Sequence, residues 1–278
     1  MKRFLRASLS FAWLELKALR FYPVNGALQV VQSFVSVGIW FFVSLLLNDF
    51  AAPDLAEFGG DFVAYMVVGV LFFQNAGSVL NLPQQSLATA FWDKRLEVYH
   101  SQRHGIWAYV VGRLIWAFAY NAVMTVAVLV FGVLAAGVRL DPGLPLLPAF
   151  GFYVVFTLTV FGIGLIGAGN FFFLEIKQGR EPLTWGVNIL VRIFSGVYYP
   201  LSIIPVGLRW VTWCLPHTYA LQGVRLVMIN GAGLENADTL RAFLSLLAFC
   251  VASLMAGIWM LNRGLRNAEA GNGIAVVG

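Results

Sequence analysis

Residues 114–137 read LIWAFAYNAVMTVAVLVFGVLAAG, an apolar run without a charged side chain. About 20 helical residues span the roughly 30 Å hydrocarbon core of a bilayer, because each residue adds about 1.5 Å. Working outward from this run, the same criterion selects residues 27–47, 62–82, 150–174, 183–203 and 242–262. The sequence therefore predicts an all-α integral membrane protein with six transmembrane helices.

The composition also indicates lipid as the main solvent. Of the 278 residues, 60% are hydrophobic and 11% are charged, whereas an average soluble domain is about 25% charged. No polar stretch is long enough for a soluble domain, so we expect one membrane domain over residues 1–278. Cys214 and Cys250 can form a disulfide only if the fold brings them together. The histidines are too scattered to suggest zinc, and we expect no metal site.

Lysine and arginine residues lie mostly on one side of the predicted spans. They cluster before residue 23, in the connection 83–112, between the fourth and fifth spans, and after residue 262. The opposite side carries only Arg139, Arg209, Arg225 and Arg241. By the positive-inside rule, both termini are expected in the cytoplasm, with the chain in a bacterial or archaeal plasma membrane.

Residues 1–23 predict an amphipathic interfacial helix rather than a cleavable signal peptide. Its apolar face is formed by Leu5, Leu9, Ala12, Leu16 and Leu19, which recur at steps of three and four. A topological anchor and a role in gating both remain open for it.

Two further segments are too apolar for plain loops. The run FWDKRLEVYH at 91–100 predicts a short cytoplasmic helix that lies either on lipid headgroups or on a partner protein. Residues 201–241 are aromatic but interrupted by proline, which favours a re-entrant helical hairpin in the outer leaflet over a surface-lying anchor.

Two motifs follow the predicted fifth span: SGVYYPLSIIP at 195–205 and LPHTYALQGVR at 215–225. Together with the six-span layout, they resemble the ABC-2 type permease family, the transmembrane subunits of ABC exporters. The resemblance implies that a cytoplasmic coupling helix docks into an ATPase and that an outer gate follows the fifth span. The coupling residues would be Leu96, Glu97, Val98, Tyr99 and His100, and the gate residues Tyr198, Tyr199, Pro200, Pro205 and Pro216.

The family also implies a transporter of two permeases, here a homodimer, and two ATP-binding subunits. The chain contains no G-x-x-x-x-G-K-[ST] motif, so we expect ATP and Mg²⁺ on the partner subunit, no cofactor on this chain and no enzymatic activity of its own. The match to G-x-G-x-x-G at 162–167 lies inside a predicted span. Its small residues therefore indicate close helix packing rather than a dinucleotide site.

Arg192 is the most unusual residue within a predicted span. It follows Pro182 by ten positions, about 15 Å at helical rise, and a charge at that depth is a candidate functional residue. It would contact an anionic substrate group or the dimer seam, unless the span begins later and Arg192 lies near its end. Interhelical hydrogen bonding is favoured over substrate recognition for the intramembrane amides, which are Gln74, Asn75, Asn121, Asn170 and Asn188.

The sequence thus predicts the permease of an ATP-driven exporter for a lipophilic or amphipathic substrate, a drug-like molecule or a lipid-linked glycan. The alternative is an ATP-independent secondary transporter or channel, which would need inverted repeats and buried carboxylates for ion coupling. A membrane enzyme would need a convergent cluster of reactive groups, and the sequence offers none.

Overall fold

The computed structural model describes residues 2–51, 55, 58, 61–102, 105–138, 140–141, 143, 145–173 and 181–270. Within these ranges the regular structure is helical, and no β-strand occurs. In chain order the helices are α1 (Lys2–Phe21), α2 (Pro23–Ala51), α3 (Phe62–Trp92), α4 (Leu96–Ser101), α5 (Gly105–Ala136), α6 (Leu146–Phe173), α7 (Pro182–Phe194), the 3-10 turns η2 (Leu201–Ile203) and η3 (Val206–Leu208), α8 (Arg209–Trp213), α9 (Pro216–Asn230) and α10 (Ala237–Ala270).

Five of the described helices, α2, α3, α5, α6 and α10, are long and apolar enough to cross a membrane. They confirm the prediction of an all-α, multi-pass membrane protein. α7 has 13 residues and is therefore only about 20 Å long. It ends at Phe194 instead of the predicted residue 203, because Ser195 caps it and Gly196 adopts a left-handed φ of 70°. The sixth full span and the re-entrant hairpin remain predictions.

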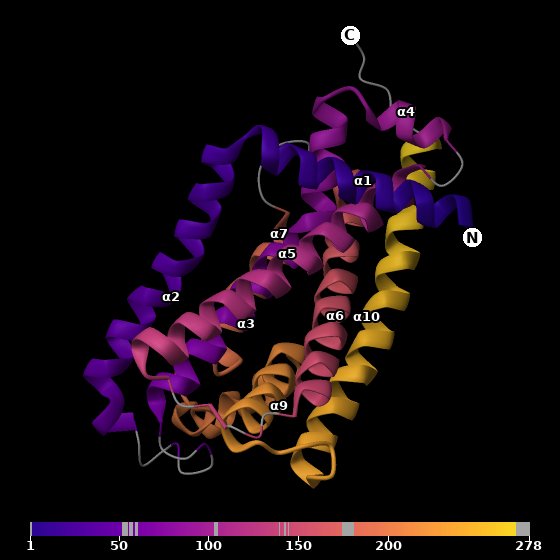
Figure 1. Cartoon of the computed structure of the whole chain (residues 1–278). Helices are drawn as coiled ribbons and strands as arrows, with labels where there is room; N and C mark the ends of the chain where they lie inside the picture. The colour runs from indigo at the N-terminus through magenta and orange to yellow at the C-terminus, as the bar shows by residue number, and fades with distance from the viewer. Residues whose placement is uncertain are drawn as a thin grey trace.

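The long helices run between two distinct ends of the molecule (Figure 1). α1, α4 and the last turns of α10 lie together at one end, which we call the α4 end. α9 and the start of α10 lie at the other, the α9 end. The start of α1 and the end of α10 thus lie at the same end of the molecule.

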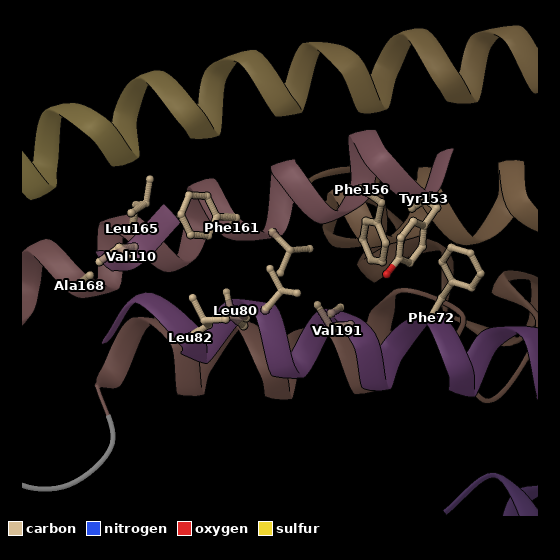
Figure 2. Close-up of a cluster of buried hydrophobic side chains, with 14 of the residues drawn as sticks. Phe72, Leu80, Leu82, Val110, Tyr153, Phe156, Phe161, Leu165, Ala168 and Val191 are labelled. Carbon is tan, nitrogen blue, oxygen red and sulfur yellow. The ribbon is translucent and has the colours of Figure 1, made fainter. Parts of the chain in front are cut away.

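The main core lies where α3, α6, α7 and α9 meet, with α10 along the outside of α6 (Figures 1 and 2). Phe72 and Leu80 of α3 face Phe156 and Leu165 of α6, and Val191 of α7 joins them. All five side chains are almost fully buried. The contacts among these side chains hold α3 and α7 against α6.

Glycines allow α6 to approach α10 closely. A Cβ on Gly257 would lie 2.3 Å from the carbonyl oxygen of Gly162, and one on Gly264 would lie 2.7 Å from that of Gly169. Both pairs are separated by seven residues on their helix, so they repeat at the same face. The glycine-rich run of α6 is therefore a packing surface, which confirms that interpretation over a nucleotide-binding loop.

α1 lies across α5 at the α4 end (Figure 1). Gly112 permits the crossing, because a Cβ there would lie 2.5 Å from the carbonyl oxygen of Ser8. Glu15 of α1 forms an ion pair of 3.0 Å with Arg113 of α5. Leu5 and Leu9 remain about half exposed, as expected for the lipid-facing side of an interfacial helix.

α3 continues through Pro83 to Trp92, so the predicted cytoplasmic connection 83–112 is too long. Helices in membranes tolerate proline when neighbouring helices and hydroxyl groups compensate. Here the Pro83 ring and the carbonyl of Leu80 both pack beside Gly164 of α6, which leaves room for them. The described connection therefore reduces to α4 and its flanking residues.

Candidate functional site

A cavity of about 880 Å³ lies between α2, α3, α5 and α7. It is within the roughly 300–1,000 Å³ typical of small-molecule sites. Its α3 wall extends from Val70 to Ala88, which is about 27 Å at helical rise. The cavity therefore follows most of the thickness that a bilayer core would occupy.

Polar side chains face this cavity at helical spacing. They are Gln74, Ser78, Asn81 and Gln85 on α3, and Gln29, Gln32, Ser33 and Ser36 on α2. Residues three or four apart share one helix face, so each of these helices directs a polar stripe into the cavity. Polar surface at membrane depth is costly unless it meets protein, water or a ligand, so these two stripes require such a partner in the cavity.

Two of the predicted amides join helices at the cavity wall. Asn75 donates to the Thr125 hydroxyl at 2.6 Å, and Asn121 donates to the Ser78 hydroxyl at 2.7 Å. Both bonds hold α3 to α5. Asn170 lies elsewhere and donates to Glu181 at 3.0 Å. The prediction of interhelical hydrogen bonds is confirmed for these three amides, although Asn75 and Asn121 also line the cavity.

The other two predicted amides have different surroundings. Asn188 donates to the carbonyl of Thr184 in its own helix at 2.9 Å and lines the cavity. The Nε2 atom of Gln74 is buried, and no described group accepts a hydrogen bond from it. Neither residue joins two helices, so the prediction is wrong for Asn188, and Gln74 keeps a free donor beside the cavity.

α7 and the residues after it run along α3. Asn188 lies opposite Gly77, the Arg192 guanidinium lies 5.4 Å from the Phe73 ring, and the carbonyl of Val197 approaches Gly69. Four residues along α3 are matched by four along α7 and then by five where the chain is no longer helical. Residues 195–199 therefore continue the path of α7 along α3, although they are no longer helical.

Arg192 lines the cavity at the level of Phe73. Phe73 is eleven residues from the start of α3 at Phe62, or about 16 Å at helical rise. The arginine therefore lies about a third of the way along α3 and in the last turn of α7, away from the α4 end of its helix, and its side chain is exposed in the cavity. Its functional role remains a prediction.

Among the predicted gate residues, Tyr198 lines the cavity. Its ring stacks on Trp40 of α2, with centroids 4.2 Å apart, and lies 6.1 Å from the Phe73 ring. Tyr199 donates from its hydroxyl to the carbonyl of Ile193. Pro200 is buried after the bend, while Pro205 is exposed and Pro216 starts α9, and none of these prolines lines the cavity.

Arg225 of α9 is a residue that sequence reasoning missed. It is 2% exposed, and its guanidinium donates to the carbonyls of Gly196, Val197 and Tyr65 at 2.8, 3.2 and 3.2 Å. The Tyr65 ring lies beneath it, 3.4 Å from the centroid. Arg225 thus fixes the bend after α7 to the start of α3. The available signal was an arginine within an apolar helical run that contains no acidic residue.

The five predicted coupling residues form α4, but they do not share one face. Leu96 is 2% exposed, and the Tyr99 ring packs between Phe11 of α1 and Tyr109 of α5. Glu97 and Val98 are exposed, and His100 is half-buried. The Leu96 side chain points into the protein and holds α4 in place, and the docking role of this helix remains a prediction.

The outward surface at this end combines α4 with the last turn of α3. Val98 and Trp92 are 54% and 53% exposed, and Glu97 lies between them in the sequence.

Cys214 and Cys250 are both free thiols, so no disulfide joins them.

Comparison with known proteins identifies a family. The profile of the ABC-2 type transporter family matches residues 58–229, which include α3 to α9 but not the α2 side of the cavity. The linearmycin resistance permease protein LnrN of Bacillus subtilis (strain 168) is 31% identical over 106 residues. ABC transporter G family member 20 of Dictyostelium discoideum is 28% identical over 93 residues.

These alignments are partial. They cover 37% and 34% of this chain, and only 26% and 13% of the two relatives. The family profile covers more than half of the chain, and it includes both motifs that follow α7. The chain therefore belongs to the ABC-2 type transporter family and is a membrane subunit of an ABC transporter.

Proposed function

We propose that this chain is the permease of an ATP-driven exporter that moves an amphipathic small molecule outward from the cytoplasm or inner leaflet. The observation that carries the proposal is the polar cavity, which follows α3 from the α4 end toward the Trp40–Tyr198 stack. One of the relatives is named as a resistance permease, which favours a drug-like substrate over a lipid-linked glycan.

In this proposal the α4 end faces the cytoplasm of a bacterial or archaeal cell, and both termini lie there. The described residues at this end include Lys2, Arg3, Lys94, Arg95 and Arg266, as the positive-inside rule requires. Two copies of the chain enclose the path, and two ATP-binding subunits, which hold ATP and Mg²⁺, dock on α4. ATP binding shifts the bundle between states because it favours one arrangement of the docked subunits.

An ion-coupled secondary transporter has less support. Such a protein needs carboxylates in its transport path, and no described residue that lines the cavity is acidic. Glu181 is fully buried, but it caps α7 by accepting from the Thr184 amide at 2.7 Å and also accepts from Asn170. Its hydrogen bonds assign it a structural role.

The proposal is tested by purifying the protein from its native membrane and reconstituting it. We expect an ATP-binding subunit to co-purify, and vanadate to stop transport by the reconstituted complex. If no ATPase co-purifies and an ion gradient alone drives transport, the exporter proposal fails and the secondary transporter replaces it.

The docking surface gives a second expected result. Val98→Asp places a charge on the exposed apolar face of α4, and its desolvation on docking should weaken ATPase binding about tenfold, equivalent to about 1.4 kcal/mol. Binding of the purified ATP-binding subunit to the permease measures the loss. Ser10→Asp, on the exposed face of α1 at the same end, serves as the matched control. Equal binding by Val98→Asp and wild type would remove α4 from the interface.

A further inference from the structure

The cavity changes character along its length. On α3 its wall is apolar at Val70, Leu71 and Phe73 and becomes polar from Gln74 onward. Most lining residues of the other helices follow the same division, with Trp40, Val128 and Tyr198 on the α9 side, and Gln29, Ser33, Asn121 and Asn188 on the α4 side; Met124 and Trp185 are apolar exceptions. An apolar compartment joined to a polar one matches a molecule with an apolar tail and a polar head.

Arg192 lies at the boundary between the two compartments, because it faces Phe73, the last apolar residue of the α3 wall before Gln74. Among the described residues that line the cavity, it is the one with a formal charge at neutral pH. No described carboxylate pairs with it. A guanidinium at this depth is costly without a counter-charge, and the cavity offers space for one.

Two further donors at the wall have no described acceptor. They are the Nε2 atom of Gln74 on α3 and the hydroxyl of Tyr120 on α5, both buried. Buried polar groups are nearly always hydrogen-bonded in folded proteins. Arg192 and the Gln74 amide nitrogen supply only donors and the Tyr120 hydroxyl can also donate, so a ligand that supplies acceptors fits these groups.

We propose that the cavity binds an anionic amphiphile, whose carboxylate or phosphate pairs with Arg192 and whose tail lies toward Trp40 and Tyr198. Gln74 and Tyr120 donate to oxygens of the head group. Guanidinium groups suit both anions, because their fork of N–H donors matches two oxygens. Arg192 is then the residue that selects for charge. This inference rests on the proposed function, since it assigns the substrate class of the export path.

The test measures thermal stabilisation of the purified permease in a neutral detergent, without ATP or the ATPase. Dodecyl phosphate and dodecanoate should raise the unfolding midpoint, since a ligand that binds the folded state stabilises it. Dodecyltrimethylammonium and additional dodecyl maltoside should not. Inorganic phosphate tests the need for a tail, and phosphatidylglycerol tests whether a two-chain lipid is accepted in place of a single-chain amphiphile.

Arg192→Leu should weaken the apparent affinity for dodecyl phosphate at least tenfold, whereas Arg192→Lys, which keeps the charge but loses the fork of donors, should weaken it less. Gln74→Leu and Tyr120→Phe should weaken it several-fold. Arg209→Leu, which removes an exposed arginine at the α9 end, should leave it unchanged. Stabilisation by phosphatidylglycerol that depends on Arg192 supports the proposal and identifies the lipid as a ligand.

Equal stabilisation of wild type and Arg192→Leu, an equal effect of the cationic amphiphile, or an equal effect of inorganic phosphate would overturn the proposal. Because the measurement needs no ATPase, this failure is distinguishable from failure of ATP-driven export. Co-purification and vanadate inhibition would still support the exporter in that case.

Discussion

Replacing Arg225 with methionine is expected to lower the thermal midpoint of the purified permease by roughly 10 °C and to abolish transport. The side chain donates three hydrogen bonds to buried carbonyls, and bonds from charged donors contribute about 1.5–3 kcal/mol each. Allowing for non-additivity, the loss is about 4 kcal/mol, and each kcal/mol moves the midpoint of a chain this size by roughly 2–4 °C.

Loss of transport is expected because Arg225 holds the bend after α7 against the first turns of α3. Gly196 and Val197 belong to the bend that ends α7, and Tyr65 belongs to the first turns of α3. Tyr198, in the same bend, lines the cavity and stacks on Trp40. Without the guanidinium the carbonyl of Val197 loses the buried partner it has in the structure, so the bend and Tyr198 lose their fixed position.

Gly69→Ala provides an independent route to the same effect. A Cβ at residue 69 would lie 2.2 Å from a terminal nitrogen of Arg225 and 2.6 Å from the carbonyl of Val197. The variant keeps the arginine but displaces it from its carbonyls, and we expect the same loss of transport with a smaller loss of stability. Differential scanning fluorimetry and a transport assay measure both.

Arg209→Met is the matched control for Arg225→Met. Arg209 also donates to two carbonyls, of Ile204 and Ser202, at 3.0 and 2.9 Å. The residue is exposed, however, so water replaces the lost bonds and the midpoint should move little. If Arg209→Met and Arg225→Met had the same effect, the role assigned to the buried arginine would be wrong.

Hydropathy identified the long helices because a helix that crosses a membrane needs about 20 apolar residues in a row, and such a run is visible in the sequence. It could not place the end of α7. Residues 183–203 are apolar throughout much of their length, but the helix ends at Phe194 because Gly196 turns left-handed and the following carbonyls bond to Arg225. Those bonds join residues about thirty positions apart, and no local pattern shows them.

The cavity could be predicted in part from the sequence. Gln74, Ser78, Asn81 and Gln85 recur at three and four residues within an apolar run, which is the pattern of one polar helix face. Taken one at a time, such residues are also consistent with interhelical bonds, and Asn75 and Asn121 do make them. Only the structure shows that the stripes of α2 and α3 face the same space.

The orientation of α4 could not be predicted from the sequence for a related reason. A six-residue helix has no reliable amphipathic period of its own, so its buried side is set by what it packs against. Tyr99 faces inward because Phe11 and Tyr109 form a place for its ring. The predicted segment therefore coincides with a helix, but the packing of α4 against α1 and α5 determines which of its residues face outward.

Gly257→Ala is the second change with a large expected effect, because it acts on the packing that holds α10 to the bundle. The new Cβ would lie 2.3 Å from the carbonyl oxygen of Gly162 and 2.8 Å from Cβ of Leu165. Real Cβ atoms do not approach backbone oxygens so closely, and both neighbours belong to the rigid helix α6. The two helices must therefore move apart, at a cost of about 2–3 kcal/mol.

Gly257→Ala/Gly264→Ala should cost more than either single change, because the second methyl group meets the carbonyl of Gly169 at 2.7 Å. We expect a lower thermal midpoint and a broadened size-exclusion profile after solubilisation. Gly38→Ala on α2 is the matched control, since no atom lies within 4 Å of a Cβ placed there. Wild-type stability of the double variant would show that α6 and α10 are not packed through these glycines. A lower thermal midpoint in the double variant and its two single variants, but not in Gly38→Ala, supports the contact.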